Sequence, residues 1–194
     1  MIFCKSRKSA ERTLKNIIPF IEKKLFLKVN RKKTEVAHIS AVKYLGYSFY
    51  RHKGKCRFRV HPKSVAKMKN RIRELTDRNK GISNEVREKK YQEYVRGWVE
   101  YFRLADMKKL LQKTDEWARR RIRAVYWKQW KKIKTKCRML KALGLEDWKA
   151  KELANSRKGY WRMAKVLNQI FSNKIIAKFG YTSILDYYLM VFEN

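Results

Sequence analysis

The ionisable side chains of this sequence are scattered, and their spacing forms no catalytic or metal-binding pattern. The aspartates lie far apart, with no D-x-D or D-D pair, at Asp77, Asp106, Asp115, Asp147 and Asp186. Two-metal phosphoryl transfer needs clustered carboxylates to hold Mg²⁺. The histidines His38, His52 and His61 stand alone and are expected in turns or on phosphates. The residues themselves therefore predict a binding protein with no catalytic residue, metal site or cofactor.

Arginine and aromatic residues recur at helical spacing between residues 106 and 134. If one helix runs through this segment, its buried stripe consists of Met107, Leu110, Leu111, Ala118, Ile122 and Val125. The other side then carries a second set, Arg119, Arg123, Tyr126, Trp130 and Lys134, with Arg120 and Trp127 beside them, which are candidate binding residues. Guanidinium groups bind phosphates and aromatic rings stack on unpaired bases. The pattern predicts a helix that lies on nucleic acid; the alternative is a solvated basic face whose tryptophans pack on a neighbouring helix.

The net charge of +34 on 194 residues indicates the class of partner. With 51 Lys and Arg against 17 Asp and Glu, self-repulsion opposes folding unless a polyanion neutralises it. A disordered basic tail is excluded, because 44% of the residues are hydrophobic and 13% are aromatic. Each cation placed on a phosphate backbone releases counterions. We therefore expect a folded nucleic-acid-binding protein, with an anionic membrane surface or a merely solvated basic exterior as weaker alternatives.

Cysteine usage and hydropathy predict a cytoplasmic location. The three cysteines, Cys4, Cys56 and Cys137, are widely spaced and form no C-x-x-C pair, which indicates reduced thiols. The N-terminus has no apolar signal segment. No apolar run approaches the roughly 20 residues that span a bilayer, so we expect no membrane partner.

The first segment of the chain combines a helix with short extended stretches. Apolar residues between Ser6 and Lys24 fall on one helical face, and Pro19 should kink that helix or end it early. Residues 25–29 and 35–39 are expected to form short strands on either side of a polar turn.

A β-hairpin is predicted next. Residues 44–50 and 56–60 alternate in polarity and are joined by a polar, glycine-containing turn, His52-Lys-Gly-Lys. In the second strand Arg57 and Arg59 share one face, which makes them a second candidate RNA-binding surface. Residues 1–61 are thus α+β in pattern.

Every segment after Pro62 has helical periodicity. The first helix has the apolar stripe Val65, Met68, Ile72 and Leu75 and should stop near Gly81. Ser83 is expected to cap the next helix, whose apolar face consists of Tyr91, Tyr94, Val95, Trp98, Tyr101, Phe102 and Ala105. The predicted fold class is α+β: a small N-terminal α+β part with a β-hairpin, followed by an all-α region.

Several of these segments, in this order, resemble motifs of the reverse transcriptases encoded by group II introns. Two of them are similar to the last two palm motifs, a turn near the nucleotide-binding end and a hairpin that grips the primer end: Asn30, Lys33 and Thr34, then Tyr44, Leu45, Gly46 and Tyr47. The stretches 95–102 and 115–130 are similar to the helical thumb and maturase region. The chain departs from the family at Phe26, where glycine is usual before the leucine that corresponds to Leu27.

The resemblance implies three parts: the end of the palm (1–61), a thumb and maturase-type helical domain (62–145) and a C-terminal helical extension (146–194). It also implies that the fingers and most of the palm, with every metal-binding aspartate of the family, lie outside this sequence. The His/Cys-rich endonuclease module of some members is absent too. Mg²⁺ is then expected only for the intact polymerase, and this chain is expected to be a C-terminal piece without polymerase activity.

Three function classes stay open. The first is the thumb and maturase portion of such a protein, which binds structured group II intron RNA and assists its folding and splicing. The second is a component of an RNA-directed DNA polymerase completed by another chain, with a DNA primer or target as a further partner. The third is a generic basic DNA-binding protein, although no compact helix-turn-helix or zinc-finger spacing is present. The sequence leaves the oligomeric state open.

Overall fold

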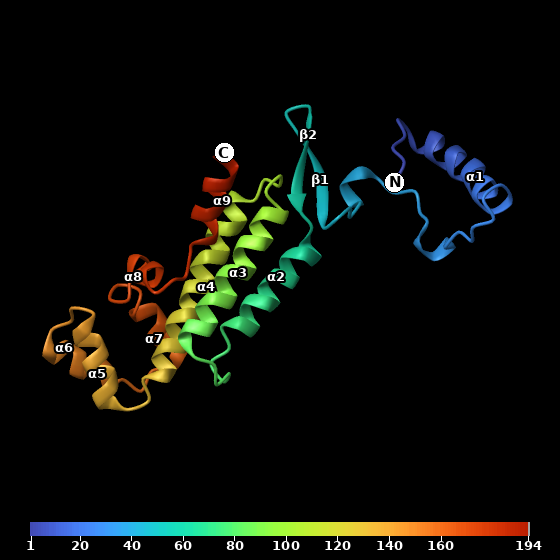
Figure 1. Ribbon diagram of the computed structural model, residues 1–194. Coiled ribbons are helices and arrows are strands. Elements are labelled where there is room, and N and C mark those ends of the chain that lie inside the picture. The colour runs from blue at the N-terminus through green and yellow to red at the C-terminus, as the bar shows by residue number, and fades with distance from the viewer. Residues whose placement is uncertain (194) are drawn as a thin grey trace. The chain divides into compact units, whose positions relative to one another are not determined.

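The computed structural model describes residues 1–193 and divides the chain into two units, residues 1–59 and the residues from Val60 onward. This division lies within three residues of the boundary predicted before Pro62. The first unit contains one α-helix and almost all of a two-stranded hairpin, and the second unit is helical (Figure 1). The predicted α+β fold class is confirmed.

Helix α1 (Arg7–Lys23) begins where the sequence predicts, because the Ser6 side chain accepts a hydrogen bond from the Ser9 amide at 3.2 Å. Pro19 lies inside this helix, so the prediction that it ends the helix early is wrong. A proline removes one backbone hydrogen bond, but the turns that follow still close: the Lys24 amide donates to the Phe20 carbonyl at 2.9 Å. The apolar positions of α1 share a face, yet none of its side chains is buried.

The strands predicted at residues 25–29 and 35–39 are not formed. In their place the chain has two short 3₁₀ turns, η1 (Arg31–Lys33) and η2 (Ile39–Ala41). A strand needs a neighbouring strand to form hydrogen bonds with its backbone groups. In these segments, contacts between residues close in sequence form instead. The Asn30 side chain accepts the Lys33 amide at 3.2 Å, which fixes η1.

The predicted hairpin is confirmed as β1 (Tyr47–His52) and β2 (Lys55–Val60). Its two-residue turn places Lys53 at φ 46° and Gly54 at φ 77°, the left-handed backbone that a type I′ hairpin turn requires. Phe58 packs edge-on against Phe49 with ring centroids 5.5 Å apart. The hairpin therefore has one aromatic face, and Arg57 and Arg59 are exposed.

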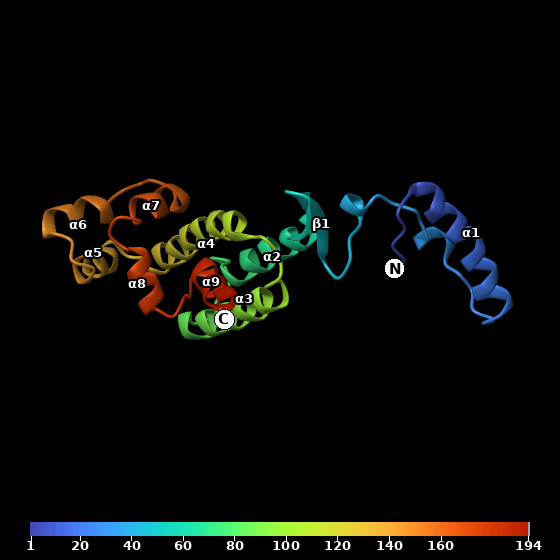
Figure 2. The ribbon, with the colours of Figure 1, turned by 90° about the horizontal axis from the view of Figure 1, so that it is seen from above.

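The second unit is built from helices of unequal length. They are α2 (Pro62–Leu75), α3 (Asn84–Tyr101), α4 (Lys108–Gln129), α5 (Ile133–Ala142), α6 (Asp147–Ala154), α7 (Tyr160–Val166), α8 (Asn173–Lys178) and α9 (Ile184–Glu193). Helix α4 contacts α2, α7 and α9, while α3 contacts α2 and α9, and α5 packs on α6 (Figures 1 and 2). The longest helix is therefore covered from more than one side.

Most of the apolar residues predicted for these helices form the core, whereas Tyr101 of the predicted α3 face is exposed. From α2 the buried members are Met68, Ile72 and Leu75, and from α4 they are Leu111, Ala118, Ile122 and Val125. Ser83 caps α3 as predicted, accepting the Val86 amide at 3.3 Å. Two bounds differ from the prediction: α2 ends at Leu75, well before Gly81, and α4 ends at Gln129 and does not continue to Lys134.

Candidate nucleic-acid interface

Much of the predicted RNA-binding stripe on α4 is buried. The exposed fractions of Arg123, Tyr126, Trp127 and Trp130 are 3%, 5%, 2% and 7%. The prediction that they form an exposed face is wrong for these four residues. The physical reason is that α4 is a central helix, whose second side is covered by the segment from α7 to α9. Periodicity separates two faces of a helix, but it cannot show that both are covered.

Arg123 satisfies backbone and side-chain acceptors inside the protein. Its Nε donates to the Phe171 carbonyl and its Nη2 to Asn173 Oδ1, both at 2.7 Å. Burial, with a smaller effect of the nearby Arg119, lowers the pKa of Arg123 to about 10. The guanidinium still carries its charge at neutral pH, and its donors bind the turn between α7 and α8.

The aromatic residues of the same face pack on one another. Tyr126 meets Phe171 with ring centroids 5.2 Å apart, and Trp130 lies 6.0 Å from Trp127 and 6.4 Å from Phe171. The Tyr126 hydroxyl donates to Glu88 of α3 at 3.0 Å. These contacts join α4 to the turn between α7 and α8 and to α3, in agreement with the alternative in which the tryptophans pack inside the protein.

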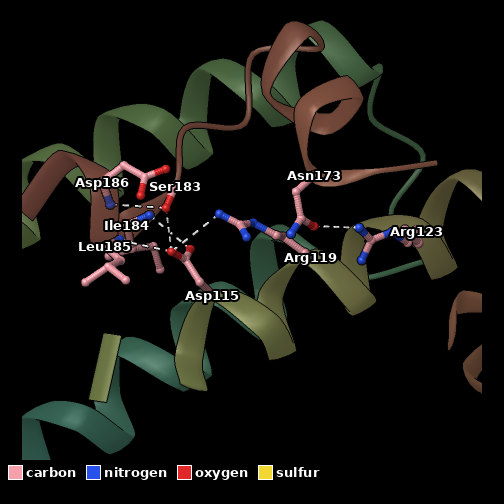
Figure 3. A network of polar contacts seen from close by, with 8 residues as sticks. All are labelled: Asp115, Arg119, Arg123, Asn173, Ser183, Ile184, Leu185 and Asp186. Carbon is pink, nitrogen blue, oxygen red and sulfur yellow. Dashed lines mark hydrogen bonds and ion pairs between the residues drawn. The ribbon is translucent and has the colours of Figure 1, made fainter. Parts of the chain in front are cut away.

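Three side chains spaced four residues apart on α4 point toward the chain between the end of α7 and the start of α9: Arg123 toward Asn173, and Arg119 and Asp115 toward the residues before α9 (Figure 3). Asp115 is 3% exposed and accepts from the Ser183 hydroxyl at 2.7 Å, the Ile184 amide at 2.9 Å and the Leu185 amide at 3.0 Å. Arg119 forms an ion pair with the same carboxylate at 3.7 Å. The Ser183 hydroxyl caps α9 by accepting the Asp186 amide at 3.1 Å, and Asp115 adds to this cap by accepting the two amides before it.

An arginine cluster, made of Arg73, Arg78 and Arg121, lies where the end of α2 meets α4. Arg73 and Arg121 both lie over the ring of Trp117, at 5.5 and 5.4 Å from its centroid. Arg121 also donates to the Thr76 hydroxyl at 2.7 Å. Burial, and then the charges of Arg73 and Arg78, lower the pKa of Arg121. Because Arg73 and Arg78 are exposed, a phosphate can approach and offset this repulsion.

Sequence reasoning missed Arg73 and Arg78 as site residues, although both were visible as charges. They come from α2 and from the loop that follows it, whereas the predicted stripe lies on a single helix. Arg121 lay among the α4 arginines, but only the packing of α2 on α4 brings the three guanidinium groups together. This cluster is therefore the candidate nucleic-acid interface.

The five other predicted RNA-binding residues remain accessible to different degrees. Lys134 is exposed on α5, as Arg57 and Arg59 are on β2, and the Arg119 side chain is 20% exposed. Arg120 is half-buried, and its Nη2 donates to the Trp161 carbonyl at 2.9 Å. RNA contact by these residues stays a prediction.

The two palm-like motifs form local turns. In the first, the Thr34 hydroxyl donates to the Asn30 carbonyl at 2.9 Å. In the second, Tyr44 and Tyr47 exchange backbone hydrogen bonds of 3.1 and 2.8 Å around Leu45 and Gly46, at φ 48° and 82°. The roles implied for Lys33 and these residues at a primer stay predictions.

Phe26, the position at which the sequence departs from the group II intron family, adopts φ 53°. This left-handed conformation favours glycine and is strained for a bulky residue. Its side chain is 87% exposed, so no packing compensates for the strain.

Residues 1–193 contain no group of three or more His, Cys, Asp or Glu side chains that could hold a metal ion. No helix of the same residues combines the length and the apolar character needed to cross a bilayer.

Comparison with known proteins gives a match for part of the helical region. Residues 65–144 match the family model described as the group II intron, maturase-specific domain. No curated protein sequence matches the chain. The resemblance to the maturase region of group II intron reverse transcriptases is thereby confirmed over α2 to α5, a stretch that contains the arginine cluster, and it supports a maturase-related role in splicing.

Proposed function

We propose that this chain is the RNA-binding thumb and maturase portion of a group II intron reverse transcriptase, and that it assists the folding and splicing of intron RNA. The arginine cluster within the matched domain carries this proposal. Two of its three guanidinium groups are exposed, and their mutual repulsion favours a bound anion. Structured RNA is held through phosphates and 2′-hydroxyls more than through a readable major groove, so clustered arginines on rigid helices suit it.

The chain on its own is proposed to have no polymerase activity. Two of the five aspartates are engaged in other contacts: Asp115 caps α9 from within the core, and Asp147 pairs with Lys141 and with Lys151. A carboxylate held in this way is not available to bridge two Mg²⁺ ions. Primer extension on an RNA template with Mg²⁺ tests this statement, and template-dependent incorporation by the purified chain would contradict it.

The function is tested by splicing of a group II intron RNA at limiting Mg²⁺, with and without the chain. We expect the chain to raise the splicing rate and the double variant Arg73→Ala/Arg78→Ala to lose most of this effect. Arg71→Ala is the matched control, because Arg71 lies on the same helix but is already paired with Glu74 at 2.7 Å. A chain that binds intron RNA no better than a DNA duplex would favour the generic DNA-binding alternative.

A polymerase component completed by another chain is a second candidate. The observation that favours it is α1, an amphipathic helix without a single buried side chain, in a unit whose motif turns are also exposed. An added chain that supplies the palm aspartates would then restore primer extension. If the mixture extends no primer while splicing assistance persists, this second candidate is wrong.

A further inference from the structure

A second basic and aromatic site lies mostly outside the matched residues 65–144, where the loop after α6 enters α7; of its lining, Arg78 alone belongs to the matched stretch. Tyr160 and Trp161 are 41% and 42% exposed, an unusual state for two adjacent large rings. They line an open hollow of about 820 Å³ together with the preceding loop residues. This volume lies in the range of small-ligand sites, about 300–1,000 Å³.

Each ring is held by an arginine from a different element. The Arg78 guanidinium lies 4.9 Å from the Tyr160 ring centroid, and the Arg120 guanidinium lies 4.0 Å from that of Trp161. Arg120 also donates to the Trp161 carbonyl at 2.9 Å, which fixes the backbone at the start of α7. The rings are therefore positioned by contacts on one side while a large part of their surface stays exposed.

The charge of the hollow is of one sign. Its lining includes Arg78, Arg157, Lys158 and Arg162 and no aspartate or glutamate. A ligand must then be anionic, and the two exposed rings favour one that also has planar apolar groups. Nucleotides combine both properties, because phosphates alternate with bases whose faces stack on aromatic side chains. An acidic peptide or an anionic lipid offers the charge without the planar groups.

We propose that this cradle, formed by Tyr160, Trp161, Arg157, Lys158 and Arg162, binds unpaired nucleotides of a single-stranded nucleic acid. The bases stack on the two rings and the phosphates lie on the flanking cations. A duplex keeps its base faces stacked internally, so the cradle discriminates in favour of single strands. The inference rests on the proposed function, because both require a nucleic acid as the partner. It adds a binding site for single strands whose aromatic rings lie outside the residues that match the maturase-specific domain model.

The test measures binding of the full chain to a fluorescein-labelled oligouridylate, the matching oligothymidylate and an RNA duplex. We expect Trp161→Ala to weaken binding to the oligouridylate by about 5- to 150-fold, the effect of losing one base–aromatic stack. Duplex affinity should change by less than about twofold, because phosphate contacts remain. Trp148→Ala is the matched control, since Trp148 is 63% exposed on α6 and does not line the cradle. It should bind all three like the wild type.

Further variants separate stacking from folding. Trp161→Phe keeps an aromatic ring and should recover most of the affinity, and Tyr160→Ala should weaken single-strand binding in the same way. Circular dichroism checks that each variant retains its helices. If Trp161→Ala does not fold, the Tyr160→Ala variant decides the question alone. Equal losses for oligouridylate and oligothymidylate indicate a site for either backbone, and a loss confined to the RNA strand identifies RNA as the ligand.

The outcomes distinguish this inference from the proposed function. If the wild type binds structured RNA and oligouridylate but Trp161→Ala and Tyr160→Ala bind both normally, the cradle is not a nucleotide site and only this inference is overturned. If oligoglutamate displaces oligouridylate and the variants lose both equally, the cradle is a general polyanion surface, which also overturns it. If the wild type binds no nucleic acid, the proposed function fails first.

Discussion

The Asp115 carboxylate, in the middle of α4, accepts the hydroxyl hydrogen of Ser183 at 2.7 Å, just before the first turn of α9. It also accepts the amides of Ile184 and Leu185. A negative charge at a helix N-terminus is favourable because the backbone dipoles leave partial positive charge there. One side chain therefore joins the region that matches the maturase-specific domain model to α9.

We expect Asp115→Ala to lower the free energy of unfolding by about 1–3 kcal/mol, because it leaves buried donors without an acceptor. Urea unfolding followed by circular dichroism measures this loss. Glu116→Gln, an exposed neighbour on the same helix, is the control and should unfold like the wild type. Equal stability of the two variants would mean that Asp115 does not hold α9.

Arg123→Ala should behave as a structural variant. The Phe171 carbonyl and Asn173 lose a donor, so we expect a loss of about 1–3 kcal/mol in the free energy of unfolding. The dependence of RNA affinity on salt should stay as in the wild type, because this guanidinium reaches no phosphate. A shallower salt dependence in a folded Arg123→Ala protein would contradict the burial of this residue.

Phe26→Gly should stabilise the turn after α1. The left-handed backbone costs a residue with a β-carbon about 1–2 kcal/mol, while the added freedom of glycine in the unfolded chain offsets part of that gain. Slower hydrogen exchange of the Leu27 amide, which donates to the Ile21 carbonyl at 3.1 Å, would report the stabilisation. Faster exchange in the glycine variant would show that the phenylalanine ring supports the turn.

Alkaline pH should unfold the helical unit through its buried tyrosines. Burial raises the pKa of Tyr91, Tyr126 and Tyr181 above the ordinary value of 10.0. A raised pKa in the folded state contributes stability that is complete below the unfolded pKa and is lost as the pH rises past it. Arg123, between its lowered pKa of about 10 and the ordinary 12.5, acts in the opposite sense. Arg121, whose pKa is also lowered, acts in the same sense as Arg123, so two groups stand against three.

The measurement is urea unfolding between pH 9 and 12 in high salt, which screens the repulsion among lysines. The free energy of unfolding should fall by roughly 1 kcal/mol per pH unit above pH 10. In Tyr126→Phe the decline should be shallower, because one ionisable group is gone. An unchanged free energy of unfolding across this range in the wild type would show that these tyrosines ionise without unfolding.

The sequence predicted correctly those elements that depend on interactions between neighbouring residues. The Lys53-Gly54 turn, the Ser83 cap and the stripe ending at Leu75 each follow from a few neighbouring residues, and each is found where expected. The roles of the two faces of α4 could not be predicted from local patterns. In the sequence, Trp127 and Trp130 could either stack on bases or pack inside the protein. The answer depends on how α7 to α9 pack against α4, and these contacts are between residues distant in sequence.

The strands predicted near Leu27 failed for a related reason. Apolar and β-branched residues favour extended structure, but a strand also needs a partner for its backbone, and the described residues around it offer none. The arginine cluster escaped prediction because Arg73 and Arg121 are distant in sequence and meet only through the packing of α2 on α4.

The salt dependence of intron RNA affinity tests the central claim most directly. For the wild type, log affinity against log salt should fall steeply, because bound phosphates release counterions. In Arg73→Ala/Arg78→Ala the slope should flatten by up to about one unit per lost phosphate contact, while Arg71→Ala keeps the wild-type slope. A double variant that retains both the affinity and the slope of the wild type would contradict the assignment of the arginine cluster as the RNA interface.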